Sequence, residues 1–188
     1  MKSFQERLFN DFDVKLEQQE NGKVKRVYVY KGDYASWDLN EEMLKRYRRL
    51  YAAAGLLLCA LYIWKSVLRT PMNADGIVGG FTMLSFVALM ILVIGLWNFV
   101  FAKKEMYIRD TKQMIPLIMG GSIAFALFQA ATAAAAVLFL IRNRVDTNGI
   151  LILIGSLISA LLSGCLFLAQ KKLTYSERKG SGGSAQDN

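Results

Sequence analysis

Few residues in this chain could perform chemistry, and their types and spacing form no catalytic set. None of the 188 residues is histidine, which removes the commonest metal ligand and the commonest general base at neutral pH. Asp75 and Asp110 stand singly, and both cysteines, Cys59 and Cys165, fall within apolar segments. Free cysteines in such surroundings behave as small hydrophobic residues. The sequence therefore predicts a protein that is not an enzyme, with no catalytic residue, no metal site, no cofactor and no disulfide.

A few polar side chains interrupt the apolar segments and could mark a functional site. Gln129 lies near the middle of one segment and Asn98 near the end of another. Gln129 could line a path or bind a ligand, but we expect the commoner role of an intramembrane amide, a hydrogen bond to another helix. Lys65 lies at the far end of the first segment, close to Arg69. We expect its side chain to snorkel to the nearby membrane surface.

The elements that must position these groups are apolar blocks of membrane-spanning length. The chain is 54% hydrophobic and 20% charged, and its apolar residues gather in blocks close to the roughly 20 residues that a bilayer requires. The predicted spans cover residues 50–68, 77–102, 115–141 and 150–170. The predicted fold class is an all-α membrane protein, a four-transmembrane-helix bundle over residues 50–170.

Small residues at four-residue spacing predict where the last two spans meet. Small side chains let helix backbones approach closely in lipid. The predicted packing positions are Ser122, Ala126, Ala130 and Ala134 in the third span and Gly155, Ser159 and Ser163 in the fourth. We expect these two spans to form a tight hairpin.

The distribution of cations predicts the orientation in the membrane. Of the 23 Lys and Arg residues, 19 lie before the first span, between the second and third, or after the fourth. By the positive-inside rule, these three segments are cytoplasmic. The outline resembles the small four-span proteins of bacterial membranes, so we expect a plasma membrane location with both termini cytoplasmic. The net charge of +8 then reflects the membrane, and we expect no nucleic-acid partner.

The polar segments outside the spans have weaker patterns. Within the predicted cytoplasmic segment 1–49, we expect a short helix and then a β-hairpin with strands near 14–20 and 23–30, because Asn-Gly separates two alternating runs. An amphipathic helix capped by Asp38 should lead into the first span. Residues 171–188, rich in glycine and serine, should form a disordered cytoplasmic tail.

Four cations precede the first span and predict contact with lipid headgroups. They are Lys45, Arg46, Arg48 and Arg49. Cations beside an apolar helix face are typical of segments that lie against anionic lipid. Other membrane proteins, or a second copy of the chain, are the remaining candidate partners.

One motif near these cations resembles a catalytic one. Glu41, Glu42 and Arg46 spell EExxxR, which resembles the first motif of the CAAX-type intramembrane proteases. That family also requires histidines in later spans, which this chain lacks, and the motif here precedes the membrane. We interpret these residues as part of a capped amphipathic helix.

Three classes of function remain after these exclusions. The leading one is a non-enzymatic membrane protein that acts through partners, as an accessory or regulatory subunit. The second is a small transporter or channel component, although no acidic residue lies within a span as proton-coupled transport usually requires. The third, which has the least support, is a membrane-embedded enzyme.

Overall fold

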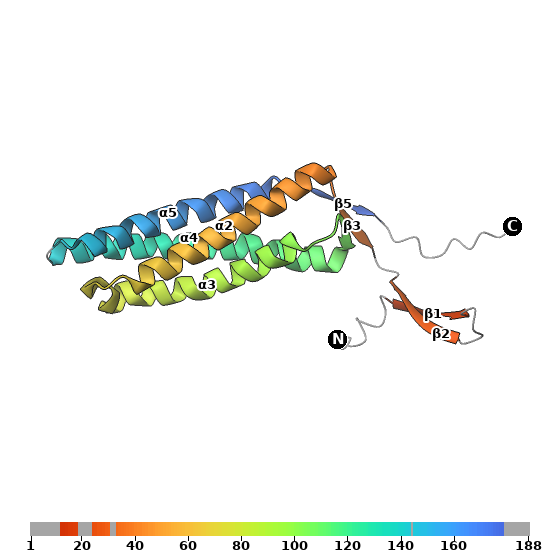
Figure 1. Ribbon diagram of the computed structural model, residues 1–188, viewed down its shortest axis with the longest axis horizontal. Helices are drawn as coiled ribbons and strands as arrows, with labels where there is room; N and C mark the ends of the chain where they lie inside the picture. Colours follow the sequence, from red (N-terminus) through yellow and green to blue (C-terminus); the bar gives the residue numbers. More distant parts are fainter. Residues whose placement is uncertain (1–11, 19–23, 31–32, 144, 179–188) are drawn as a thin grey trace.

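Four long helices lie side by side and make up most of the structure (Figure 1). This computed structural model describes residues 12–18, 24–30, 33–143 and 145–178. Each of the four is long and apolar enough to cross a membrane, which confirms the predicted number of spans. The helices are α2 (Glu41–Val67), α3 (Gly76–Val100), α4 (Ile108–Arg142) and α5 (Thr147–Lys171).

Two small sheets accompany the helices; a hairpin was expected where the first lies, whereas the second was not predicted. Strands β1 (Phe12–Gln18) and β2 (Val24–Tyr30) pair antiparallel, and the Asn-Gly turn expected between them lies outside the described residues. The second sheet has the order β4-β3-β5 and is antiparallel throughout. Its strands are β3 (Tyr34–Trp37), β4 (Glu105–Tyr107) and β5 (Tyr175–Arg178).

The three-stranded sheet corrects the prediction of a wholly disordered tail. We expected no structure after residue 171, but β5 pairs with β3, and Trp37 lies opposite Tyr175. The sequence of β5 begins with a tyrosine, which suits a short strand once a partner edge is available. The sheet joins segments from before α2, between α3 and α4, and after α5, so these three segments share one end of the bundle (Figure 1).

Trp37 fastens this sheet to the bundle. Its side chain is only 3% exposed. The indole meets the ring of Phe99 edge-on at 5.4 Å between centroids, and that of Tyr175 at 6.1 Å. Phe99 in turn lies 4.8 Å from the ring of Tyr51 on α2. Aromatic contacts of this kind contribute beyond their buried area, so the sheet and the helix ends form one continuous core.

Helix α2 differs from its predicted form at its start. We predicted an amphipathic helix capped by Asp38 that leads into the first span, but Asn40 is the cap, and its Oδ1 accepts a hydrogen bond from the Met43 N–H at 2.8 Å. The Asp38 N–H donates to the Thr174 carbonyl, which keeps the chain extended to that point. No proline interrupts the residues that follow, so the amphipathic turns and the first span form a single helix.

Helix α4 also begins earlier than predicted. The third span was predicted over residues 115–141, but the helix starts at Ile108, and Pro116 is its ninth residue. A proline inside a helix lacks the N–H that would bond the carbonyl four residues before it, here that of Lys112. The early turns carry Arg109, Asp110 and Lys112, so the helix extends past the apolar span at the end where the sheet lies.

The two connections at the opposite end are tied to each other. The Asn148 side chain donates to the Arg69 carbonyl at 2.9 Å. Asp146 caps α5 by accepting from the Asn148 N–H at 3.0 Å. The Thr70 hydroxyl and the backbone N–H of Asn148 hold the pKa of Asp146 below its usual value, despite a small opposing effect of burial. These contacts fix the α2–α3 connection against the start of α5.

Helices α3 and α4 approach each other most closely at two glycines. A Cβ on Gly121 would lie 2.8 Å from both the Cα and the N of Leu92, and one on Gly95 would lie 2.9 Å from the backbone N of Ile118. Real Cβ atoms do not tolerate such contacts, so the two backbones can meet only because these side chains are absent. Close approach through glycine is the main attraction available between helices in lipid.

The predicted small-residue stripe on α4 is correct only in part. Ser122 is buried and its carbonyl accepts a hydrogen bond from the Ser163 hydroxyl at 2.8 Å. Ala126 is half-buried, whereas Ala130 and Ala134 are exposed. Positions four apart advance about 40° around a helix with 3.6 residues per turn, so the stripe drifts off the interface.

On α5 the predicted positions do lie inward, and α4 turns a different set of residues toward the core. Gly155, Ser159 and Ser163 are all buried. The buried face of α4 continues through Phe125, Gln129, Thr132, Ala133 and Ala136. Steps of three and four residues keep this set on one side of the helix.

We predict that alanine destabilises the protein at Gly121 but not at the adjacent Gly120 on α4. Gly121→Ala should force α3 and α4 apart and lower the free energy of unfolding by about 1–3 kcal/mol, the usual cost of overpacking. Gly120→Ala is the matched control, because its Cβ would meet no atom within 4 Å. Thermal unfolding of the purified proteins in mild detergent measures both. Equal melting temperatures would contradict the assigned α3–α4 contact.

Candidate functional site

A lysine lies buried between three helices. Lys65 of α2 is 1% exposed, and its ammonium donates hydrogen bonds to Oε1 of Gln129 on α4 and to Oγ of Ser156 on α5. The bond to Ser156 is 3.2 Å long. Gln129 and Ser156 are themselves fully buried. The bond to another helix expected of Gln129 therefore has a charged donor.

The prediction that Lys65 snorkels outward is wrong. The Cα–Cβ bond of a helical residue tilts toward the helix N-terminus, and Lys65 lies in the last turn of α2. Its side chain therefore leaves the backbone toward the middle of the bundle. The Arg69 carbonyl, four residues after Lys65, accepts a hydrogen bond from Asn148 in the first turn of α5. The Lys65 ammonium instead donates to Ser156. Ser156 lies eight residues, or about 12 Å, further along α5, so the lysine side chain points into the bundle.

The partners of this ammonium are all neutral. Besides the amide and the hydroxyl, the ring of Tyr62 lies 5.6 Å from Nζ. Within the described part of the chain, no carboxylate lies at ion-pair distance from Lys65, and the Nε2 group of Gln129 has no hydrogen-bond partner. A charge in an apolar interior is costly and is typical of functional positions. Lys65, Gln129 and Ser156 are therefore one candidate site, which we call the lysine centre.

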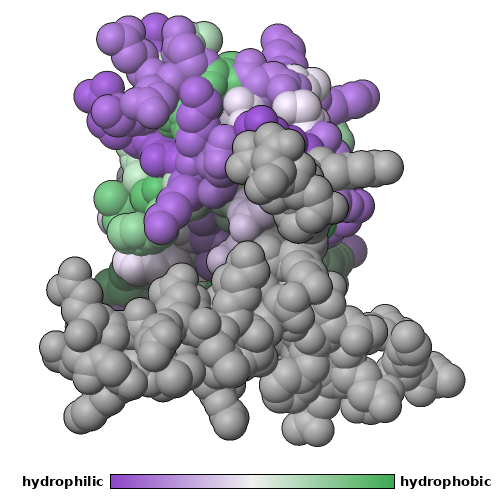
Figure 2. Space-filling view, turned by 90° about the vertical axis from the view of Figure 1, so that its right-hand side faces the viewer, coloured by the Kyte–Doolittle hydropathy of each residue, from purple (hydrophilic) through white to green (hydrophobic). Residues whose placement is uncertain are grey.

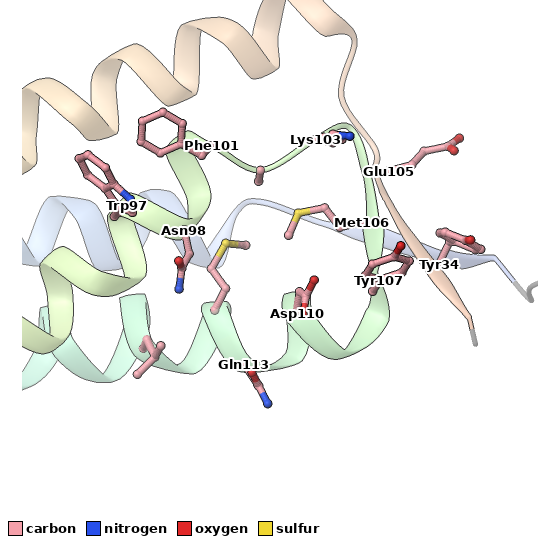
Figure 3. Close-up of a pocket in the computed structure, with 13 residues that line it drawn as sticks. Tyr34, Trp97, Asn98, Phe101, Lys103, Glu105, Met106, Tyr107, Asp110 and Gln113 are labelled. Atoms are coloured by element: carbon pink, nitrogen blue, oxygen red, sulfur yellow. The ribbon is translucent and has the colours of Figure 1, made fainter. Parts of the chain in front are cut away.

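A second candidate lies at the sheet end, where α3 gives way to α4. A cleft of about 790 Å³ opens there between the end of α3, strand β4 and the first turns of α4. Figure 3 shows Asn98 and Asp110 extending into this cleft from α3 and α4. Trp97 and Phe101 form one wall, with ring centroids 4.7 Å apart. Asn98, predicted as an intramembrane polar residue, is exposed and lines this cleft. We call it the interface cleft, because it lies where the apolar spans meet the polar sheet end.

A shallow apolar groove adjoins the interface cleft. Its volume is about 570 Å³, and it follows α4 beside Ile91 of α3. Three of its lining residues have little or no side chain, Gly120, Gly121 and Ala124, and Pro116 also lines it. Gln113 and Leu117 line both the cleft and the groove, so the two hollows are continuous.

The predicted lipid-contact cations lie at the same end of the molecule as the sheet. Lys45, Arg46 and Arg49 are exposed on the first turns of α2, whereas Arg48 is half-buried. Figure 2 shows this end face, where the described side chains are mostly hydrophilic. Exposed cations near the start of a span can contact anionic headgroups.

In the part of the chain that the structure describes, no metal site and no pair of cysteines is assembled. No group of three or more His, Cys, Asp or Glu side chains comes together there. Cys59 and Cys165 are both free, the first half-buried on α2 and the second exposed on α5.

Lys65, Gln129 and Asn98 were singled out from the sequence, but the two sites that they help to form were not predicted. Lys65 was visible as a charge inside a span, but its direction depends on which end of α2 it occupies. The cleft combines residues of α3, β4 and α4, and β4 has only three residues.

Comparisons with protein-family models, with curated proteins and with solved structures return no match.

We predict strong coupling between Lys65 and Gln129. Gln129→Leu should lower the free energy of unfolding by about 1–3 kcal/mol, because it leaves the buried ammonium short of an acceptor. In a Lys65→Met background the same change should cost little, since an apolar pair replaces a polar one. A double-mutant cycle by chemical or thermal unfolding in detergent gives the coupling energy. Additive effects would show that the two side chains do not interact in the membrane.

Proposed function

We propose that the chain is a non-enzymatic, multi-pass membrane protein that acts as an accessory or regulatory subunit. Its contact surface is the polar end formed by the β4-β3-β5 sheet and the first turns of α2. The observation that supports this most is the joining of three separate segments into that sheet, anchored by the buried Trp37. A fixed polar surface at one end of a membrane bundle is suited to holding a partner in one orientation.

The proposed orientation places the sheet end in the cytoplasm. Exposed cations at this end include Lys45, Arg46, Lys103, Lys104, Lys171 and Lys172. At the opposite end Arg69 and Arg142 are exposed, whereas Lys65 is buried between helices. This asymmetry supports cytoplasmic termini by the positive-inside rule, and the proposed location is a bacterial plasma membrane.

Cysteine labelling of intact cells tests the orientation. The background is Cys59→Ala with Cys165→Ala, and single cysteines then replace Ser176 on β5 and Asn143 after α4, both of which are exposed. An impermeant maleimide should modify the cysteine at position 143 in intact cells and the one at 176 only after lysis. The reverse pattern would contradict the proposed topology.

Affinity capture in mild detergent tests the proposed role. A partner held at the sheet end should co-purify with the full chain at a constant ratio. Replacement of Lys45, Arg46 and Arg49 by glutamine should reduce that ratio at least several-fold, because charged contacts steer and hold polar surfaces. The matched control replaces Arg69 and Arg142 at the other end. A partner lost equally from both variants, or from neither, would count against the sheet end as the contact surface.

The lysine centre favours a second candidate function, a transporter or channel component. Intramembrane lysines mark ion and substrate paths in many transporters. In proteoliposomes, chloride- or proton-sensitive dyes would then report a flux that Lys65→Met abolishes. The accessory role instead predicts no flux above that of empty vesicles and unchanged partner capture by Lys65→Met.

A further inference from the structure

The interface cleft is partly polar, and the groove that continues from it is apolar. The cleft carries charged and polar groups, including Lys103 and Asp110, and the groove beyond Leu117 is almost entirely apolar. The change from polar to apolar occurs where the charged first turns of α4 meet its apolar span. A ligand that fills both hollows therefore needs a polar head and an apolar chain.

The length of the groove matches one leaflet of a bilayer. Lys112 and Ala124, which line its two ends along α4, are twelve residues apart. At about 1.5 Å per residue this distance is about 18 Å, a little more than half of the roughly 30 Å hydrocarbon core. An acyl chain of the leaflet at the sheet end would therefore lie along the groove over its whole depth.

The lining of the groove suits an acyl chain. Ile91, Pro116, Leu117 and Ala124 present apolar surface, and Gly120 and Gly121 leave space beside it. A flexible hydrocarbon chain can follow such a surface, and it carries no backbone polar groups that need hydrogen-bond partners at this depth. These features favour lipid as the occupant.

The charged residues that line the cleft are Lys103, Glu105 and Asp110, so it carries both signs, as a zwitterionic headgroup does. Asp110 extends into the cleft from the first turn of α4, and the exposed rings of Trp97 and Phe101 stand on its α3 side (Figure 3). A carboxylate and aromatic faces both attract an ammonium group. Lys103 on the α3–α4 connection supplies a positive charge for a phosphate.

We propose that the cleft and groove bind one zwitterionic phospholipid of the leaflet at the sheet end. The ammonium group lies at Asp110 and the aromatic wall, the phosphate at Lys103, and one acyl chain along Pro116, Gly120 and Ala124. This site goes beyond the proposed accessory role and does not depend on it. A bound lipid in this position bridges the end of α3 and the start of α4.

Native mass spectrometry of the full chain in mild detergent tests this proposal. Phosphatidylethanolamine, phosphatidylcholine and phosphatidylglycerol of identical acyl chains are each titrated into the delipidated protein. We expect one zwitterionic lipid per chain, bound at least tenfold more tightly than phosphatidylglycerol. A preference for ethanolamine would identify Asp110 as the main ammonium contact, and a preference for choline would identify the aromatic wall.

Two pairs of variants separate the site from general lipid contact. Gly120→Leu fills the groove without meeting another atom at its Cβ, and Gly164→Leu makes the same change on α5, where the Cβ is also free. Gly120→Leu should weaken binding at least tenfold, and Gly164→Leu should leave it unchanged. Lys103→Gln should weaken it several-fold, whereas Lys104→Gln, next to the cleft but outside its lining, should not.

A third change tests the headgroup and is independent of the groove. Asp110→Asn alters one exposed carboxylate and should remove most of the preference for zwitterionic lipid over phosphatidylglycerol. The proposal is overturned if the protein retains no lipid, if phosphatidylglycerol binds as tightly as the other two, or if Gly120→Leu binds like the unaltered protein.

Discussion

The structure depends on the contact between the backbones of α3 and α4 at Gly121 and Leu92. In lipid there is no hydrophobic force between helices, and close packing must supply the attraction. Gly121 has no side chain, which lets its backbone meet that of Leu92. Gly95 does the same against Ile118, and the two contacts bring the helices together. The same pairing places the end of α3 beside the start of α4, where the interface cleft opens. Gly120, adjacent to the contact residue but turned outward, leaves the groove on the lipid side.

Helix α2 is held differently from the other three. It crosses the face of the bundle (Figure 1) and is joined to it by aromatic rings at the sheet end and by Lys65 near the other. A buried ammonium that bonds to a single amide and a single hydroxyl depends on the positions of both. This dependence fixes the position of α2 along the bundle axis relative to α4 and α5. Apolar contacts alone specify such a position poorly.

Much of the membrane domain could be predicted from the sequence, because bilayer thickness dictates the length of each apolar block. The number of spans is confirmed. The early start of α4 could not be predicted, since Arg109, Asp110 and Lys112 have ordinary helix propensity but no apolar signal. The three-stranded sheet was missed because strands of three or four residues exist only through partners that are distant in the sequence.

The candidate sites were predicted less well than the spans. The importance of Gln129 was visible because an amide is rare inside a span, but its partner was not, since the direction of the Lys65 side chain follows from the polarity of α2. The small-residue stripe failed at Ala130 and Ala134 although the same repeat of four lies inward on α5, because the way each helix is turned in the bundle decides which of its residues face inward. The cleft consists of ordinary interface residues that become a site only when α3, β4 and α4 meet.

The position of β3 in the middle of its sheet has a consequence for how the chain matures. Its two partners follow it by about 70 and 140 residues along the chain, so neither edge can be covered while the first spans are being made. β5 leaves the ribosome only after α5, and its pairing with β3 therefore occurs last. Since β5 must reach the same side of the membrane as β3, the closed sheet forms only in chains whose four helices have all been inserted. A chain with an odd number of inserted spans would therefore keep one edge of β3 unpaired and open to pairing with another chain.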